Sequence, residues 1–88
     1  MIPTLIADDS AAELDVILYL IKKYNLPLTP TVASDGEEAL NYIQKTPVDL
    51  LITDIRMPFM DGLVLAEKAL AVNPRLKIII SSGYQDFS

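Results

Sequence analysis

Residues 49–62, DLLITDIRMPFMDG, give the clearest prediction of the fold of any stretch in this chain. The run at residues 50–53 is apolar or β-branched, without the alternation that marks a half-buried strand. Such a run predicts a central parallel strand that is covered on both faces. It stops at an acid, Asp54, and residues 55–62 then form a loop. The chain therefore places a carboxylate at the end of its most buried strand.

The segment after this loop has helical spacing. Leu63, Ala66 and Leu70 recur at the period of one helix face, and we expect them to form its buried side. Asn73 and Pro74 end the helix. Residues 77–80 are again mostly apolar, which predicts a further strand, and Ser81, Ser82 and Gly83 close it.

The same order of elements appears upstream of residue 49. Residues 4–7 predict a buried strand that ends in Asp8 and Asp9. Ser10 and Glu13 then form a capping-box pattern at the start of a helix over residues 11–24. Two prolines within residues 25–30 break that helix, and residues 31–33 carry a weaker strand pattern.

The second predicted helix begins after Asp35, whose side chain can cap it. Ala39, Leu40 and Ile43 fall on one face of it, and it ends before Pro47. Strands and helices thus alternate along the chain, which predicts a parallel sheet joined by right-handed crossovers, with helices on its faces.

Rossmann-like and flavodoxin-like folds both begin with this alternation. A dinucleotide fold would carry a G-x-G-x-x-G loop after the first strand, and this chain has Asp8, Asp9, Ser10 and Ala11 there. We therefore expect the flavodoxin-like α/β class. With 88 residues the chain has room for one small domain and not for two.

Composition excludes several classes of function. Hydrophobic residues make up 51% of the chain, which favours a folded globular unit over a disordered one. The net charge of -5, with scattered basic residues, argues against nucleic-acid binding. The absence of cysteine and histidine excludes disulfides, thiolate zinc sites and imidazole catalysis. No pattern of a signal peptide or a membrane span is present, so we expect a cytoplasmic location.

Polar side chains stand at successive strand ends, where open parallel sheets bind ligands. Asp8, Asp9 and Asp54 would meet there, near Ser82. Each acid by itself has an ordinary explanation as a helix-start or turn residue, but their joint placement favours a site. Converging carboxylates suit Mg2+, and an aspartate beside such an ion is a plausible nucleophile toward phosphorus.

Residues 53–62, TDIRMPFMDG, resemble the phosphorylation loop of response-regulator receiver domains, whose pattern is an aspartate followed by M-P-x-M-D-G. Residues 7–10, ADDS, resemble the acidic pair that this family carries after its first strand. Residues 80–84, ISSGY, resemble its switch segment. The order of the three segments agrees with the family along the whole chain.

The resemblance implies a role for each matching residue. Asp54 would be the phosphoacceptor, served by a histidine kinase, and Asp8 and Asp9 would hold Mg2+ together with Asp54. The backbone carbonyl of Arg56 would be a further metal ligand. Ser82 would be the switch hydroxyl that turns toward the phosphoryl group. The domain would be a regulatory phosphoacceptor and not an enzyme, apart from Mg2+-dependent self-phosphorylation and self-dephosphorylation.

One family feature is missing from the sequence. Receivers carry a phosphoryl-pairing lysine at the end of a fifth strand, and no lysine here lies at a matching position. We therefore expect residues 1–88 to form a receiver domain that is incomplete at its C-terminus. The expected strand order is 2-1-3-4, without the fifth strand and the last two helices.

The fourth strand, with Ile78, Ile79 and Ile80, should then be an apolar sheet edge that favours self-association. Residues 82–87 resemble regulators of the AraC type, which continue into a DNA-binding domain, so a longer parent protein could carry such an output.

Two other classes of function remain open. A phosphatase of the haloacid dehalogenase type needs a second acid two residues after its aspartate, and Arg56 stands there, which weakens that reading. A receiver-like module that is never phosphorylated, and serves only in interaction or dimerisation, is consistent with the missing lysine.

Overall fold

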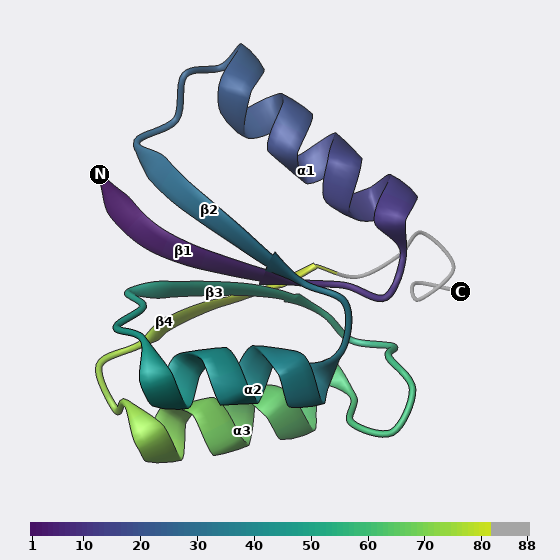
Figure 1. Cartoon of the computed structure of the whole chain (residues 1–88), viewed down its shortest axis with the longest axis vertical. Helices are drawn as coiled ribbons and strands as arrows, with labels where there is room; N and C mark the ends of the chain where they lie inside the picture. The colour runs from purple at the N-terminus through teal and green to yellow at the C-terminus, as the bar shows by residue number, and fades with distance from the viewer. Residues whose placement is uncertain (82–88) are drawn as a thin grey trace.

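The computed structural model describes residues 1–81, in which strands and helices alternate (Figure 1). The elements are β1 (Ile2–Ala7), α1 (Ala11–Lys23), β2 (Leu28–Ala33), α2 (Gly36–Lys45), β3 (Leu50–Asp54), α3 (Gly62–Val72) and β4 (Lys77–Ser81). The four strands are all parallel and lie in the order β2-β1-β3-β4. The expected fold class and strand order are therefore confirmed.

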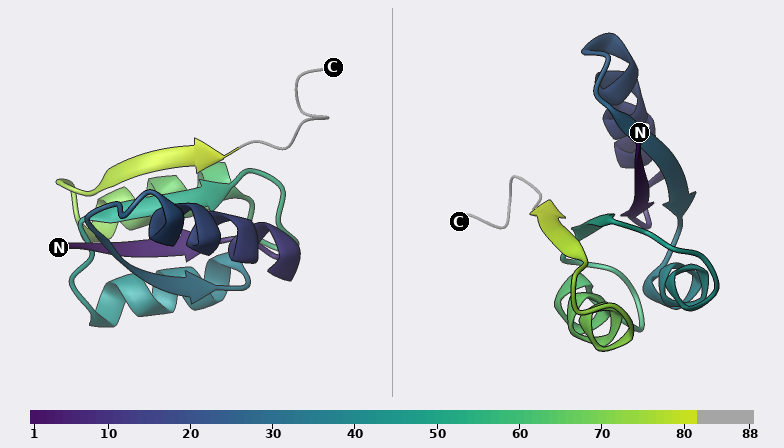
Figure 2. Two further views of the ribbon diagram at one scale, coloured as in Figure 1. Left: turned by 90° about the horizontal axis from the view of Figure 1, so that it is seen from above. Right: turned by 90° about the vertical axis from the view of Figure 1, so that its left-hand side faces the viewer.

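The helices cover the two faces of the sheet unequally. Helices α2 and α3 lie side by side on one face, and α1 lies alone on the other (Figure 2). The larger core lies on the α2/α3 face and includes the fully buried Leu5, Leu51 and Leu65. On the α1 face the buried cluster within residues 1–81 consists of Ile6, Leu14 and Ile21.

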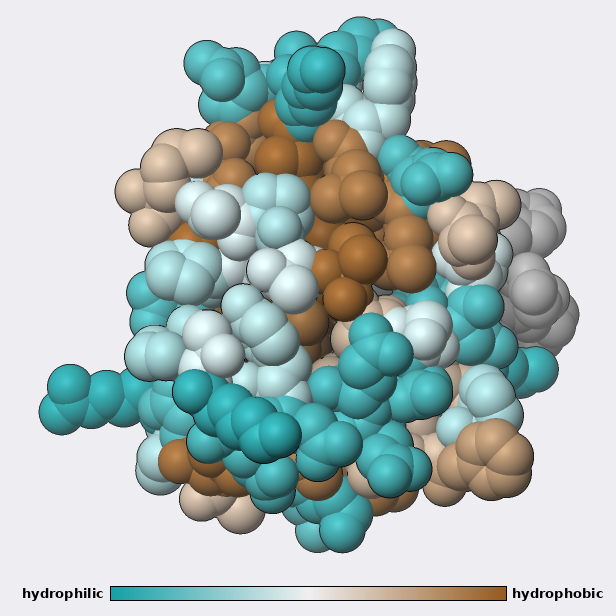
Figure 3. Space-filling model, viewed as in Figure 1, coloured by the Kyte–Doolittle hydropathy of each residue, from teal (hydrophilic) through white to brown (hydrophobic). Residues whose placement is uncertain are grey.

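The central strand β3 shows the same imbalance. Leu51 and Thr53 point toward α2 and α3 and are 0% exposed, whereas Ile52 on the α1 face is only half-buried. In Figure 3 apolar side chains gather where α1 meets the sheet, and the partly buried Ile17, Leu18 and Leu28 pack against the core cluster on this face. The expectation of a strand fully covered on both faces thus holds for one face.

Two N-caps follow the sequence pattern. The hydroxyl of Ser10 accepts a hydrogen bond from the backbone N–H of Glu13 at 3.3 Å, and Asp35 accepts one from Glu38 at 2.7 Å. A third cap comes from Asp61, whose Oδ1 accepts from the N–H of Val64 at 2.9 Å. These bonds satisfy amides that have no partner within their helices and so fix where α1, α2 and α3 begin.

Strand β2 is longer than the sequence predicted. It begins at Leu28 and includes Pro30, whereas the prolines had indicated a break through residue 30. The physical reason is its position, because β2 is an edge strand paired only with β1 in the described residues. A proline that cannot donate an N–H is tolerated at a sheet edge.

The buried face of α3 was predicted wrongly. Leu65 and Ala69 are fully buried together with Gly62, whereas Leu63 and Leu70 are exposed. Every predicted position is one residue, or about 100°, away from the true face. Because apolar residues surround most of this helix, periodicity alone could not select the face; the packing of its first residue did.

No helix within residues 1–81 is long and apolar enough to cross a membrane.

Candidate functional site

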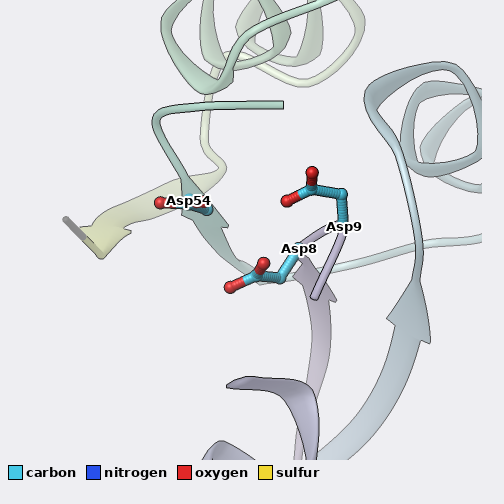
Figure 4. A group of neighbouring side chains, drawn as sticks. All are labelled: Asp8, Asp9 and Asp54. Carbon is cyan, nitrogen blue, oxygen red and sulfur yellow. The ribbon is translucent and has the colours of Figure 1, made fainter. Parts of the chain in front are cut away.

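The site lies at the edge of the sheet where the parallel strands end. Asp8 and Asp9 follow β1, and Asp54 is the last residue of β3, the strand next to β1. One carboxylate oxygen from each of the three residues lies within 4.8 Å of the others. Figure 4 shows Asp8 and Asp9 extending from their turn toward the strand end that carries Asp54. The predicted meeting of these acids is present in the structure.

Local hydrogen bonds orient two of the three carboxylates. Oδ1 of Asp8 accepts the backbone N–H of Ser10 at 2.9 Å, which ties the side chain to the turn before α1. Oδ1 of Asp54 accepts the N–H of Ile55 at 2.9 Å. Each carboxylate is therefore held by the backbone that immediately follows its strand.

The three side chains differ in their access to water. Asp8 is buried, with 3% of its surface exposed, Asp54 is half-buried, and Asp9 is exposed. Burial raises the pKa of Asp8 above its ordinary value, and the negative charges of Asp54, Glu13 and Asp9 raise it further. The hydrogen bond from Ser10 acts in the opposite direction on that pKa. A cation among these oxygens would relieve the repulsion.

The donor set fits a hard divalent cation. All three ligands are carboxylate oxygens, and Asp9 and Asp54 remain open to water and to a further ligand. Mg2+ has this preference for a few carboxylates together with waters and phosphate oxygens. The described residues of the site thus offer oxygen ligands for such a cation.

Gly62 holds the loop after β3 against the end of that strand. Its N–H donates to the carbonyl oxygen of Ile55 at 2.7 Å, and a β-carbon added to it would lie 1.9 Å from the carbonyl oxygen of Asp54. Only a residue without a side chain fits there, so Gly62 shapes the loop. Met57 is buried in the core beneath the same loop.

The remaining predicted site residues fall in two places. Arg56 is exposed in the loop after β3, two residues beyond Asp54. Ser82 lies outside the described residues, and so does Gly83; the residue before them, Ser81, is paired with Asp54 in the β3–β4 register.

Two features of the site were not predicted. Glu13, in the first turn of α1, is close enough to Asp8 to raise the pKa of that carboxyl. The sequence pattern identified Glu13 only as part of a capping box and did not indicate that it lies near the site. Phe59 has a positive φ of 70° and is fully exposed. The sequence shows only that a bulky apolar residue stands between Pro58 and Met60 in a predicted loop, and this does not predict a positive φ.

Comparisons with known proteins agree with this geometry. The family model of the response regulator receiver domain matches residues 4–88. The transcriptional regulatory protein YesN of Bacillus subtilis is 36% identical over 88 residues, which cover 99% of this chain and 24% of YesN. The chain spans between 20% and 31% of the length of several curated relatives that it matches.

Solved structures show the same fold. A two component transcriptional regulator AraC from Clostridium phytofermentans superimposes with a TM-score of 0.86 at 34% identity, covering 98% of this chain and 70% of that one. Response regulator protein TrrA from Thermotoga maritima, solved in complex with Mg(2+)-BeF, gives a TM-score of 0.88 at 28% identity, covering 99% of this chain and 74% of that one.

The alternating parallel fold, the carboxylates at its strand ends and the family match over residues 4–88 lead to one conclusion. The chain belongs to the response regulator receiver domain family of two-component systems.

Proposed function

We propose that Asp54 accepts a phosphoryl group from a histidine kinase, with Mg2+ held by Asp8, Asp9 and Asp54, and that this modification switches an output function. The observation that carries the proposal is the meeting of three carboxylates at one edge of the sheet. Membership in the receiver family supports it, because residues 7–10 and 53–62 resemble the acidic pair and the phosphorylation loop of that family.

The transfer step uses one oxygen of Asp54. The N–H of Ile55 holds Oδ1, which leaves Oδ2 as the oxygen that we assign as the nucleophile. Oδ2 attacks phosphorus and forms a new O–P bond while the N–P bond to the kinase histidine breaks. The electron pair of that bond returns to the imidazole ring, and the product is an aspartyl phosphate.

The acids around Asp54 would support this step by holding Mg2+ beside it. When bound, Mg2+ supplies positive charge that offsets the carboxylates and the incoming phosphoryl oxygens. Asp8 must be ionised to hold it, and burial works against that ionisation, so cation binding and proton release from Asp8 are coupled. We assign the backbone carbonyl of Arg56 as a further ligand, and TrrA, solved in complex with Mg(2+)-BeF, supports the choice of metal.

The switch step is assigned to Ser82. Its hydroxyl donates a hydrogen bond to a phosphoryl oxygen on Asp54, which moves the segment after β4 and changes the surface that a partner contacts. The pairing of the preceding residue, Ser81, with Asp54 supports this assignment.

Acetyl phosphate tests the phosphoacceptor directly. The chain is incubated with acetyl phosphate and Mg2+ and its intact mass is measured. We expect the mass to rise by one phosphoryl group, to fall again at alkaline pH, and not to change in Asp54→Asn. Asp15→Asn, which alters an exposed aspartate on α1, serves as the matched control and should label normally. Labelling of Asp54→Asn at the normal rate would disprove the assignment.

A second function, that of an interaction module that is never phosphorylated, is favoured by one observation. Within residues 1–81 no lysine follows the end of a strand beside Asp54, where it could pair with a phosphoryl group. Lys77 is the first residue of β4 and pairs with Leu50, at the end of β3 opposite Asp54. Absence of any adduct in a chain lengthened beyond residue 88 would select this function over phosphoryl transfer.

Further proposals concern partners and location. Within the described residues β4 pairs only with β3, and Ile79 and Ile80 are 52% and 37% exposed, so we propose self-association through this edge. We also propose a cytoplasmic location and, in a longer parent protein, a DNA-binding output segment. The similarity to YesN and to the AraC regulator supports that output.

A further inference from the structure

Phe59 occupies an unusual position in the loop that follows Asp54. Its φ of 70° lies in a region that residues with a β-carbon seldom adopt. The N–H of Met60 donates to the carbonyl oxygen of Pro58 at 2.8 Å, which closes a γ-turn of the rare, strained kind with Phe59 at its tip. The ring is fully exposed, so packing within the described part of the chain does not compensate this strain.

A hollow of about 190 Å³ lies beside this ring. It is lined by Pro58, Phe59 and Met60 from the loop and by Asp35 and Glu37 from the start of α2. Its walls are fixed by close packing, because a β-carbon added to Gly36 would meet the β-carbon and carbonyl oxygen of Met60 at 2.9 Å. The hollow is therefore a shaped part of the fold.

The charges of the hollow define what fits it. Of the described residues that line it, two are acids and none is basic. The positive end of α2 is already capped, since Asp35 accepts the N–H of Glu38. The apolar walls suit an aliphatic stem, while the carboxylates and the face of an aromatic ring suit a cationic head. An arginine or lysine side chain combines these two properties.

The position of the hollow indicates whose side chain this is. The loop follows the end of β3 and Asp35 follows the end of β2, so the hollow lies on the same side of the parallel sheet as Asp54, the side to which a phosphoryl donor must come. We propose that the hollow at Phe59 binds an arginine or lysine side chain of the protein that donates the phosphoryl group. This inference rests on the proposed phosphoacceptor role of Asp54, and it adds a recognition site separate from the reacting atoms.

Comparing two donors separates recognition from chemistry. The first donor is a purified, phosphorylated histidine kinase, chosen from a panel because it labels the wild-type chain. The second is acetyl phosphate, which is too small to fill the hollow and reach Asp54 together. The variants are Phe59→Gly, which removes the ring and tolerates the positive φ, and Glu37→Gln, which removes one charge. Glu67→Gln, an exposed acid on α3, is the matched control.

We expect Phe59→Gly and Glu37→Gln each to lower kcat/KM for the kinase by about tenfold, as truncation of an interface anchor does. Acetyl phosphate should label both variants at the wild-type rate, and Glu67→Gln should match wild type with both donors. The effect of Glu37→Gln should shrink at high salt, because screening weakens the lost attraction.

Each other outcome has a definite meaning. Wild-type rates from the kinase in both variants overturn the inference while leaving Asp54 as the phosphoacceptor. Equal slowing with both donors also overturns it, since the loop would then affect chemistry and not recognition. If neither acetyl phosphate nor any kinase of the panel labels Asp54 of the wild-type chain, the proposed function itself is overturned.

Discussion

Replacing Gly62 with alanine tests the idea that this residue holds the phosphoacceptor strand in place. In an ordinary helix position the change stabilises a protein by about 0.4–1 kcal/mol, because alanine restricts the unfolded chain. Here the added β-carbon would lie 1.9 Å from the carbonyl oxygen of Asp54, about 1 Å inside the closest separation, 3.0 Å, that β-carbons adopt. The atoms it meets are backbone, so no side chain can turn away.

The cost follows from what must move. Either α3 or the end of β3 shifts by about 1 Å, against the 2.7 Å bond from Gly62 to Ile55 and the pairing of Asp54 with Ser81. Overpacking of this kind costs about 3 kcal/mol, the upper end of the usual range. After subtracting the helix gain, the net loss is about 2 kcal/mol, which lowers the Tm of a domain of this size by about 8–16 °C.

Thermal unfolding followed by circular dichroism measures the effect, at several protein concentrations so that association is recognised. Gly36→Ala is the comparison variant, because its β-carbon would meet Met60 at 2.9 Å, a much milder overlap than the 1.9 Å at Gly62, and we expect a smaller loss of Tm. Where the end of β3 is the part that shifts, Asp54 moves by about 1 Å and labelling of Gly62→Ala by acetyl phosphate should slow by up to about 100-fold. An unchanged or higher Tm for Gly62→Ala refutes the reasoning.

Three further predictions concern charge, association and capping. Because the pKa of Asp8 is raised, the folded chain binds this proton more tightly than the unfolded chain does. Without Mg2+, the contribution of Asp8 to the free energy of unfolding should therefore fall as the pH rises from the pKa that Asp8 has in the unfolded chain through the pKa that it has in the folded chain. Urea midpoints against pH should show this fall in wild type and lose it in Asp8→Asn, which should be the more stable of the two at neutral pH. Ile79→Lys should convert an associating chain to a monomer in light scattering, and an unchanged mass would exclude the β4 edge. Asp61→Ala should cost about 1 kcal/mol in urea unfolding through loss of the cap on Val64; an unchanged midpoint would show that the cap is dispensable.

The sequence was sufficient for the features that depend on order along the chain. Alternation of strands and helices predicted the parallel sheet, and acids at the ends of the runs at residues 4–7 and 50–53 predicted the meeting of Asp8, Asp9 and Asp54. This inference succeeds because all strands of a parallel sheet run in the same direction, so their carboxyl ends lie along the same side of the sheet.

The sequence was insufficient where three-dimensional packing selects among local patterns of equal quality. A proline such as Pro30 would interrupt a central strand but is tolerated in an edge strand. Only the strand order of the sheet shows that β2 is an edge strand. Helix α3 is apolar on more than one face, so the contact of Gly62 with Asp54 decided that Leu65 and not Leu63 is buried. The γ-turn at Phe59 has no sequence pattern of its own.

Amide NMR spectra recorded during a titration with Mn2+, a paramagnetic substitute for Mg2+, test most directly whether the acidic triad is a cation site. The amide signals of Asp8, Asp9 and Asp54 should broaden first, and excess Mg2+ should restore them. Asp9→Asn should weaken the broadening at all three positions. Broadening that begins instead at Glu37 and Glu38 at the start of α2, with the triad unaffected, would contradict the account.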